Sequence, residues 1–452
     1  MGHRCASYCE RCECILNYYF GLLKNYKMNT LSQKNIWHII IGGAIGNLSE
    51  WYNFLLYGYL ASTISQLFFP THNQLISLSL TFTVFALSFF VRPFGGILFG
   101  WIGDTYGRQR ALIISLVMMA IPTFLIGCLP TYQSIGILSP VLLLILRIIQ
   151  GLSAGGEHTG SAVYIAEFAP SSRRTLWVSI IPMTAALGIL MSSLIALILI
   201  KSLSHIQLLT WGWRLGYGIG TFLCVISIFL RITLPETPYF KKELKEHPVK
   251  RYPIKILFTK PDIIKNLLTV IVLSGSWGVF YQILFVWMPT YLTQIQHFSN
   301  STALVINSSL ILLFACLILF VGFIADYLDH KSMLIISNIA MILLAYPLFT
   351  ALSSGALFKI IISLGIFTLI FSLYLPVAFV TMIELFHTDI RYTGLSFGFN
   401  LGLAIFGGTC PLIATWLIEI THNKSAPALY MMIAAAFALI ISTRISNKEI
   451  YL

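Results

Sequence analysis

Six ionisable side chains interrupt long apolar stretches, where a charge needs a partner or a function. They are Glu50, Arg92, Arg147, Glu157, Glu384 and Glu419. A carboxyl group in an apolar medium binds a proton more readily than one in water, so it can load a proton on one side of a barrier and release it on the other. We expect Glu50 and Glu157 to do this. The alternative is that each is permanently paired with an arginine.

An arginine keeps its proton, so Arg92 and Arg147 can act only as counter-ions or as two-pronged hooks for a carboxylate. We expect Arg92 to engage or tune a bound carboxylate and Arg147 to couple protonation to movement. His158 follows Glu157, but neighbouring helical side chains point in different directions, so a direct relay is not expected. Glu384 and Glu419 lie near the ends of their stretches, where we expect solvation at the interface.

Aromatic side chains surround Glu50 and crowd a later stretch. They are Trp51, Tyr52, Phe54, Tyr57, Trp277, Phe280, Tyr281, Phe285 and Trp287. Aromatic rings can hold a quaternary ammonium group through cation–π contact. For any single ring, packing in the core or against lipid is the alternative. The candidate substrate-binding residues are Arg92, Asn53, Tyr57, Trp277 and Tyr281.

The composition identifies the elements that must position these groups. Of 452 residues, 57% are hydrophobic and 10% are charged, and the mean hydropathy is +0.85. These values exclude a soluble enzyme and a disordered chain. At about 20 residues per crossing, the chain can supply about a dozen membrane helices.

The apolar runs predict an all-α membrane protein with twelve transmembrane helices in two six-helix halves. The first six runs cover residues 36–67, 75–101, 111–129, 137–168, 175–200 and 213–234, and the next six start near 266, 303, 331, 357, 392 and 426. We therefore expect an N-terminal segment over residues 1–35, halves over 36–234 and 266–444, a polar linker over 235–265 and a short tail over 445–452.

The formal net charge of +12 follows membrane topology and does not indicate a nucleic-acid-binding face. Most basic residues follow even-numbered runs: Arg108, Arg110, Arg173, Arg174, Lys241, Lys242, Lys245, Lys250, Arg251, Lys255, Lys260, Lys331 and Arg391. The other loops contain few, chiefly Lys201, Lys359 and Lys424. Since basic loops stay in the cytoplasm, both termini are expected there.

An internal repeat supports the division into halves. Residues 100–104 (GWIGD) recur as 322–326 (GFIAD), and the pair Glu167 and Arg174 recurs as Glu384 and Arg391. Two related halves joined by a linker are typical of alternating-access transporters, with substrate bound between the halves near the middle of the membrane.

A tight charged turn follows the second run. Asp104, Gly107 and Arg108 can cap a neighbouring helix or pair across the halves and then separate, so we interpret the turn as a gate. In the second half, Asp326 and Arg391 are the expected counterparts. Asp329 and His330 stand where the first half has Gly107 and Arg108.

The N-terminus contains four closely spaced cysteines, Cys5, Cys9, Cys12 and Cys14. Zinc binding is one interpretation, but no second paired unit follows. Another is that translation starts at Met28. No cleavable signal peptide is evident, and no motif for a metal, phosphate or catalytic nucleophile stands out, so neither a cofactor nor an enzyme is expected.

Several motifs resemble a known family. Residues 103–110 (GDTYGRQR), 147–151 (RIIQG) and 235–238 (PETP) resemble the major facilitator superfamily. Residues 46–54 (GNLSEWYNF), 91–96 (VRPFGG), 150–157 (QGLSAGGE) and 384–394 (ELFHTDIRYTG) resemble its metabolite:proton symporters, which carry proline and betaine, 2-oxoglutarate, citrate or shikimate. The likeness covers about residues 36–444. Residues 157–160 and 211–214 are most similar to the proline/betaine branch.

The resemblance implies a monomeric plasma-membrane symporter that imports a small carboxylate-bearing metabolite with a proton. Asn53 departs from it, because the family usually has an acidic residue there. An uncoupled facilitator or exchanger of the same fold is therefore one alternative. A transport-inactive membrane sensor is another.

Overall fold

The computed structural model describes residues 33–246 and 253–445. Contacts group the chain into residues 1–41 and residues 42–452, and the second unit is described by itself below. The N-terminal cysteines and Met28 lie outside the described residues. Every regular element in the described ranges is a helix.

We call the helices before residue 233 the first helix set and those after residue 260 the second. The first set consists of α2 (Gln33–Tyr59), α3 (Ala61–Phe68), α4 (Gln74–Phe90), α5 (Arg92–Tyr106), α6 (Arg108–Cys128), α7 (Tyr132–Ile135), α8 (Leu138–Phe168), a 3₁₀ turn (Ser171–Arg173), α9 (Arg174–Ser202), α10 (His205–Gln207), a π-helical turn (Leu208–Gly212) and α11 (Trp213–Ile232). Two short helices, α12 (Pro238–Glu246) and α13 (Pro253–Thr259), lie between the sets.

The second set has a similar series of long helices with π-helical turns. It consists of α14 (Pro261–Tyr281), a π turn (Gln282–Trp287), α15 (Met288–Thr290), a π turn (Tyr291–Ile295), α16 (Asn300–Ala325), α17 (His330–Ser353), α18 (Leu357–Glu384), α19 (Arg391–Gly402), a π turn (Leu403–Gly407), α20 (Cys410–Thr421) and α21 (Pro427–Arg444). Pro261 is the first residue of α14. A proline suits a helix start because it lacks the N–H that would be unpaired there, so the helix begins earlier than the predicted 266.

Eleven stretches of the described residues are long and apolar enough to cross a membrane. They agree with the predicted runs from the second onward, and α4 and α5 form one such stretch over Ile76–Tyr106. The first predicted run, 36–67, corresponds to α2 and α3, which one irregular residue, Leu60, separates. Backbone hydrogen bonds from Leu60 to Leu56 and from Ile64 to Leu60 continue across this residue. The helix α2 is not among the eleven stretches. It carries Asn47, Ser49, Glu50 and Asn53 in its second half.

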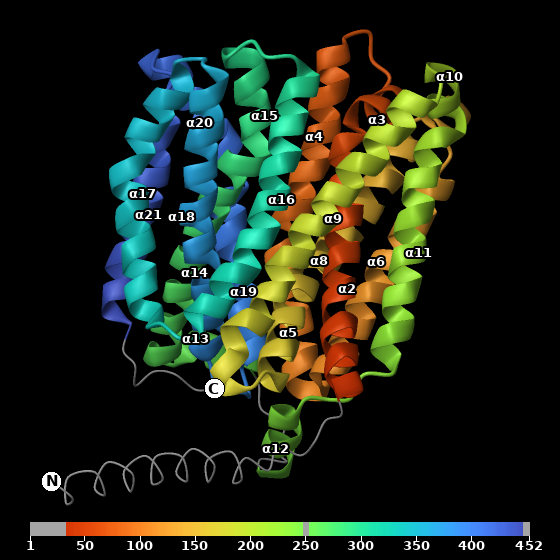
Figure 1. Ribbon diagram of the computed structural model, residues 1–452. Coiled ribbons are helices and arrows are strands. Elements are labelled where there is room, and N and C mark those ends of the chain that lie inside the picture. The colour runs from red at the N-terminus through yellow and green to blue at the C-terminus, as the bar shows by residue number, and fades with distance from the viewer. Residues whose placement is uncertain (1–32, 247–252, 446–452) are drawn as a thin grey trace, which may run out of the picture. The chain divides into compact units, whose positions relative to one another are not determined.

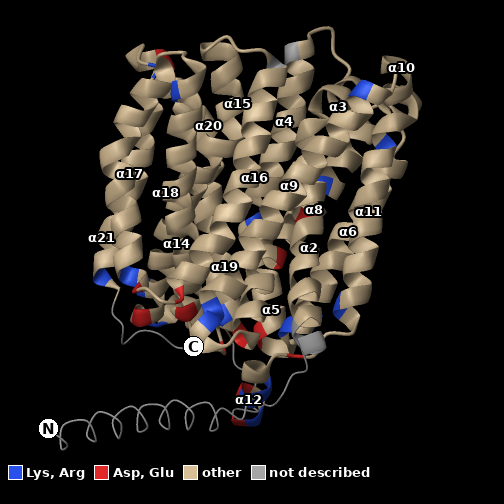
Figure 2. Cartoon of the chain, in the orientation of Figure 1, with Lys and Arg blue, Asp and Glu red and all other residues tan. Residues whose placement is uncertain are grey.

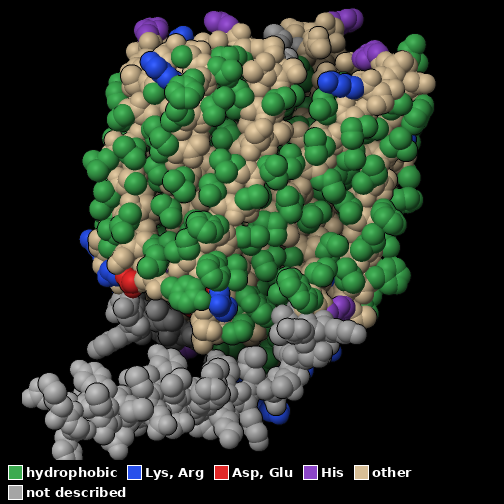
Figure 3. Space-filling view, viewed as in Figure 1, with side chains coloured by type: hydrophobic (Ala, Val, Ile, Leu, Met, Phe, Trp, Pro, Cys, Tyr) green, Lys and Arg blue, Asp and Glu red, His purple; other side chains and the backbone are tan. Residues whose placement is uncertain are grey.

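Within residues 42–452 the long helices lie side by side along a common direction (Figure 1). Their outward surface is mostly hydrophobic in its middle part (Figure 3), as expected for a surface in lipid. Charged side chains gather toward the end of the bundle at which α12 lies (Figure 2). We call this end, where α5 ends and α6, α9 and α19 begin, the linker end.

Glycines on α5 bring the two helix sets close together. A Cβ atom on Gly96 would lie 2.7 Å from the Ser396 carbonyl oxygen, and one on Gly100 would collide with the backbone of Thr393. Small residues permit such close backbone approach. The contact between α5 and α19 therefore depends on these glycines.

Candidate functional site

Glu50 and Arg92 form a buried ion pair on α2 and α5. Arg92 Nη2 lies 3.0 Å from Glu50 Oε1, and both side chains are at most 1% exposed. Arg92 Nη2 also donates to the Ala154 carbonyl oxygen at 3.2 Å. Within the described ranges, Glu50 Oε2 and Arg92 Nη1 have no hydrogen-bond partner. The pair therefore keeps one free acceptor and one free donor.

The pair also reaches the second helix set. Arg92 Nε donates to Asn400 Oδ1 at 3.2 Å, and Asn400 Nδ2 donates to the Gly155 and Ser396 carbonyl oxygens, both at 2.7 Å. Asn400 thus links α5 and α8 to α19. A change in the charge of Glu50 would therefore alter the hydrogen bonds of Arg92, including the one that it donates to Asn400.

His158 lies beside the pair at the centre of an aromatic cluster drawn from both sets. Its ring is nearly parallel to those of Trp277 and Phe379, with centroids 5.9 and 5.2 Å away. Phe399 and Trp51 also contact it, at 5.3 and 5.8 Å. His158 Nδ1 lies 2.8 Å from Asn47 Oδ1.

Trp277 and Tyr281 were predicted to bind substrate, and the structure places both in this cluster. Tyr281 lies 6.2 Å from Trp51, whose ring is 5.4 Å from the Arg92 guanidinium. The indole N–H of Trp277 is buried and has no acceptor in the described part of the chain. The structure therefore brings aromatic faces and the unpaired Trp277 N–H close to the Glu50–Arg92 pair.

The centre is nearly filled by side chains. A space of about 10 Å³, room for one water molecule, remains among residues that include His158, Trp277, Phe379 and Phe399. A larger cavity of about 460 Å³ lies between α9 and α16, toward the end opposite the linker end, and Tyr59, Ser193, Lys201 and Ser308 line part of it. A solute at the centre would require the aromatic side chains or the helix sets to move.

Glu157 lies away from this centre, inside the first helix set. Its two oxygens accept from Arg231 Nη1 at 2.6 Å and Nη2 at 2.5 Å. Ser115 and Ser161 donate to the same carboxylate at 2.7 and 3.1 Å. Glu157 is thus fully satisfied, which is the geometry of a permanent structural partner.

Three other predicted residues also lie inside the first set. Asn53 Nδ2 donates to the Ser49 carbonyl oxygen at 2.8 Å, and its side chain packs against Gly220 of α11. The guanidinium of Arg147 lies 4.4 Å from the ring centroid of Tyr57. None of these contacts involves the second set, so Asn53, Tyr57 and Arg147 are separated from Trp277 and Tyr281.

At the linker end, each helix set caps a helix of the other. Asp104 accepts from the backbone N–H groups of Tyr392 and Thr393 at 3.2 and 2.8 Å, at the start of α19. Asp326 accepts from the N–H groups of Thr175 and Leu176 at 2.7 and 3.2 Å, at the start of α9. A carboxylate is favourable at a helix N-terminus, where the N–H groups point outward.

The repeated Glu and Arg residues pair reciprocally. Arg391 Nη1 lies 2.8 Å from Glu167 Oε1, and Arg174 Nη1 lies 2.8 Å from Glu384 Oε1. Each pair joins the two sets. Glu384 is only 6% exposed, so the prediction that it is solvated at the interface was wrong, because Arg174 supplies the counter-charge.

Arg108 completes the linker-end contacts. It lies 3.2 Å from both Asp104 and Glu167 and donates to the Thr388 carbonyl oxygen at 2.6 Å. Gly107, just before it, has φ 115°, a conformation that side chains other than glycine's rarely adopt. The predicted gate residues Asp104, Gly107 and Arg108 therefore lie together.

Glu236 closes the same turn from the segment after α11. Its oxygens accept from the N–H groups of Arg108 and Gln109 at 3.1 and 3.2 Å, at the start of α6. Burial raises the pKa of the Glu236 carboxyl group, and its hydrogen bonds with Thr237 and the start of α6 partly offset this. Thr237 donates to Glu167 at 2.5 Å, so hydrogen bonds connect this segment to the predicted gate residues.

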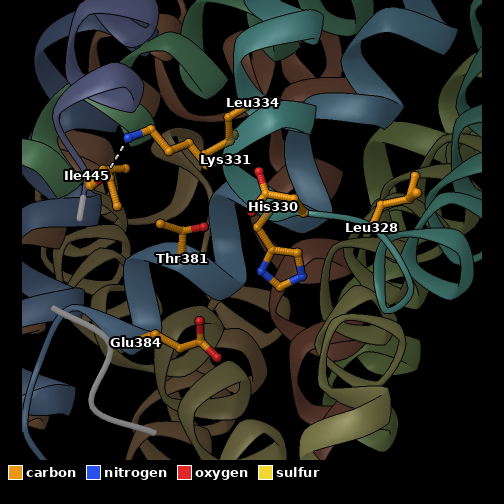
Figure 4. Close-up of a pocket in the computed structure, with 8 residues that line it drawn as sticks. Leu328, His330, Lys331, Leu334, Thr381, Glu384 and Ile445 are labelled. Atoms are coloured by element: carbon orange, nitrogen blue, oxygen red, sulfur yellow. Dashed lines mark hydrogen bonds between the residues drawn. The ribbon is translucent and has the colours of Figure 1, made fainter. Parts of the chain in front are cut away.

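A cavity of about 310 Å³ lies in the second set and is lined in part by Glu384, one of the residues of the linker-end ion pairs (Figure 4). Lys331, His330 and Glu384 lie along it, and His330 Nε2 is 3.0 Å from Thr175 Oγ1 of the first set. Its lining mixes both charge signs. In the described ranges, no group of three or more His, Cys, Asp or Glu residues is placed to hold a metal ion.

Sequence reasoning missed several residues of these clusters. They are Asn47, Arg231, Phe379, Phe399 and Asn400. Arg231 carried a usable signal, since it is a charge inside the apolar run 213–234. The others look like ordinary helix residues in sequence, and only the packing of the two sets brings them to the centre.

Comparisons with known proteins agree with this arrangement. The family model described as Major Facilitator Superfamily matches residues 39–408. The chain is 32% identical over 410 residues to the glycine betaine/proline/ectoine/pipecolic acid transporter OusA of Dickeya dadantii (strain 3937), covering 89% of this chain and 81% of that protein. It is also 32% identical over 421 residues to the proline/betaine transporter of Escherichia coli (strain K12), covering 91% and 83%.

The fold is that of solved transporters. The structure of the proton:xylose symporter XylE bound to 6-bromo-6-deoxy-D-glucose matches with a TM-score of 0.74 at 18% identity, covering 91% of this chain and 95% of that one. The resemblance seen in the motifs is confirmed. The chain belongs to the major facilitator superfamily, among the relatives of bacterial proline/betaine transporters, and is a multi-pass membrane transporter and not an enzyme.

Proposed function

We propose that this transporter imports a small zwitterionic or carboxylate-bearing metabolite of the proline/betaine kind together with a proton, by alternating access. The observation that carries the proposal is the buried Glu50–Arg92 pair, which is bonded to Asn400 of the other helix set. The names of the relatives support the substrate class. The alternative is an uncoupled facilitator or exchanger.

Glu50 is the better candidate for the proton. Its Oε2 has no partner in the described ranges, so a proton can bind there without breaking the contact at Oε1. Protonation would weaken the attraction to Arg92 and free the guanidinium for a substrate carboxylate. Glu157 remains a second candidate, but its proton would have to displace Arg231 or a serine.

The aromatic cluster around His158 suits the other end of such a substrate. The faces of Trp51, Trp277 and Tyr281 attract an ammonium group, while Arg92 attracts a carboxylate. A zwitterion could bridge the two. Tyr57 and Asn53 would act indirectly, since they pack inside the first set.

The proposed organisation is that of the predicted halves, 36–234 and 266–444, with the linker 235–265 between them, segment 1–35 before them and tail 445–452 after them. We propose twelve membrane helices, with α2 as the first, and a monomer in the bilayer. The basic residues at the linker end support a cytoplasmic orientation for that end and for both termini. The contacts of Asp104, Asp326, Arg108 and Arg391 would then close the cytoplasmic side.

The test is uptake into liposomes under an imposed inward proton gradient. The panel is labelled proline, betaine, 2-oxoglutarate and citrate. Accumulation of a zwitterion above equilibrium that collapses with a protonophore is the expected result. A response to citrate or 2-oxoglutarate alone would contradict the zwitterion assignment.

The Glu50→Gln variant tests the coupling. It should lose gradient-driven accumulation while it retains exchange of labelled for unlabelled substrate. Glu419→Gln is the matched control, since Glu419 is exposed and should behave as the wild type. Uptake by the wild type only down the substrate's own gradient would establish a facilitator, and Asn53→Asp would then test whether coupling can be restored.

A further inference from the structure

Arg147 is a buried cation without a protein counter-charge in the described ranges. Its side chain is 0% exposed, and its Nη1 donates to the neutral Gln150 Oε1 at 2.9 Å. The other fully or largely buried arginines each pair with a carboxylate: Arg92, Arg108, Arg174, Arg231 and Arg391. An uncompensated buried charge is strongly unfavourable, so Arg147 requires an explanation.

Aromatic rings hold the guanidinium but do not satisfy its N–H groups. The guanidinium carbon lies 4.4 Å from the Tyr57 ring centroid and 4.8 Å from that of Phe54. These rings contact the flat face of the group. In the described part of the chain, Nε and Nη2 have no acceptor. These two nitrogens form the edge on which a guanidinium binds an anion.

Two further buried donors lie nearby on α11. The Tyr217 side chain packs in the same buried cluster as Tyr57, whose ring lies against the Arg147 guanidinium, and the centroid of the Tyr217 ring lies 6.0 Å from that of Trp213. Both side chains are 0% exposed. The Tyr217 hydroxyl and the Trp213 indole N–H also lack partners among the described residues. The Tyr57 hydroxyl is already used, since it donates to the Thr81 carbonyl oxygen at 3.1 Å.

We propose that Arg147 and Tyr217, with Trp213 beside them, bind a small monovalent anion inside the first helix set. The cluster has a positive charge and several free donors, and an anion supplies both the missing charge and the missing acceptor. Water would supply the acceptor alone. The anion is either chloride from solution or the carboxylate of a transported solute. The site uses an arginine other than that of the Glu50–Arg92 pair, and it adjoins that pair, because the Phe54 ring lies 4.8 Å from the Arg147 guanidinium carbon and 5.4 Å from that of Arg92.

The proposal is tested by thermal unfolding of the purified full-length protein. Sodium chloride is titrated against sodium gluconate at constant ionic strength, so that general screening by salt stays fixed. The melting temperature should rise with chloride and saturate, and bromide should act similarly. Tyr217→Phe removes one donor and should weaken chloride binding, so that the half-saturating chloride concentration rises about tenfold. Arg147→Gln should abolish the dependence.

Lys359→Gln is the matched control, because it removes an exposed positive charge and should leave the chloride dependence unchanged. A wild type that ignores chloride, but is stabilised more by glycine betaine than by choline in an Arg147-dependent manner, would support the site with carboxylate as its anion. The proposal is wrong if neither chloride nor glycine betaine raises the melting temperature in a way that Tyr217→Phe changes. The Tyr217→Phe comparison decides this even where Arg147→Gln fails to fold.

Discussion

Arg231 binds both carboxylate oxygens of Glu157 through two separate nitrogens, at 2.6 and 2.5 Å, in the interior of the first helix set. Both side chains are at most 1% exposed. Removing one partner of such a pair lowers the free energy of unfolding strongly, because the other partner then remains as an uncompensated buried charge. Glu157→Gln should therefore destabilise the fold by about 3–5 kcal/mol, seen as a lower melting temperature.

A neutral pair provides the control for this prediction. Glu157→Gln combined with Arg231→Met removes both charges and should recover much of the lost stability. If Glu157 instead carries the transported proton, Glu157→Gln alone would keep the wild-type melting temperature and lose only gradient-driven uptake. That result would contradict the structural role.

Asp104 and Asp326 should control how often the linker end opens. Each carboxylate caps a helix of the opposite set, through Thr393 and Thr175 among others. Loss of the negative charge at a helix N-terminus costs about 0.3–1 kcal/mol, so Asp104→Asn should raise the open fraction about two- to fivefold. The readout is maleimide labelling of a cysteine at Ser396, which is 0% exposed in this structure.

Asp329→Asn is the control, since Asp329 caps its own helix through Ser332 at 2.8 Å and not a helix of the other set. It should leave labelling at position 396 unchanged. Asp326→Asn should act in the same direction as Asp104→Asn. Unchanged labelling in both variants would show that these caps do not hold the linker end closed.

The helices could be predicted closely because membrane helices are long and apolar. The predicted starts at 331 and 426 compare with α17 at His330 and α21 at Pro427. The irregular residue Leu60 was missed, since the apolar pattern continues through it. Hydropathy indicates the length of an apolar segment in residues, but not the position at which its backbone bends.

The sequence did not indicate which charged residues form ion pairs with each other, because the pairing depends on how the helices are rotated and packed. The repeat identified Glu167 with Arg174 and Glu384 with Arg391 as equivalent, yet the ion pairs join Glu167 to Arg391 and Glu384 to Arg174. Similarly, Glu157 pairs with Arg231 from α11, while Arg147 lies against Tyr57. A charge inside an apolar run indicates that a partner is needed, but not which residue supplies it.

His387 should make the stability depend on pH. It lies between α18 and α19, and burial lowers its pKa below the ordinary 6.5, an effect that Asp389 partly opposes. The unfolded chain therefore binds more protons than the folded one just below pH 6.5, so stability should fall as the pH drops from 7 through that range. Melting temperatures between pH 7 and pH 5 measure this.

His387→Gln should reduce that slope, because glutamine does not titrate. His205→Gln is the control, since His205 is exposed at the other end of the bundle and should leave the slope unchanged. A steeper or equal slope in His387→Gln would assign the pH dependence to other groups.

Arg92→Lys should impair transport although the charge is kept. Arg92 donates to Glu50 and Ala154 through Nη2, at 3.0 and 3.2 Å, and to Asn400 through Nε, at 3.2 Å, and a lysine has only one nitrogen for these partners. Loss of one or two charge-assisted hydrogen bonds corresponds to about 2 kcal/mol, so kcat/KM for uptake should fall about thirtyfold. Arg110→Lys, at an exposed position, should have no effect.

The Asn400→Ala variant tests how much the second helix set contributes to transport, separately from the Glu50–Arg92 ion pair. This variant keeps the Glu50–Arg92 pair but removes the acceptor for Arg92 Nε and the links to Gly155 and Ser396. It should slow gradient-driven uptake more than it weakens substrate binding, because it uncouples the ion pair from the movement of α19. An equal loss in both, or wild-type rates for Arg92→Lys, would show that this junction does not transmit the charge state of Glu50.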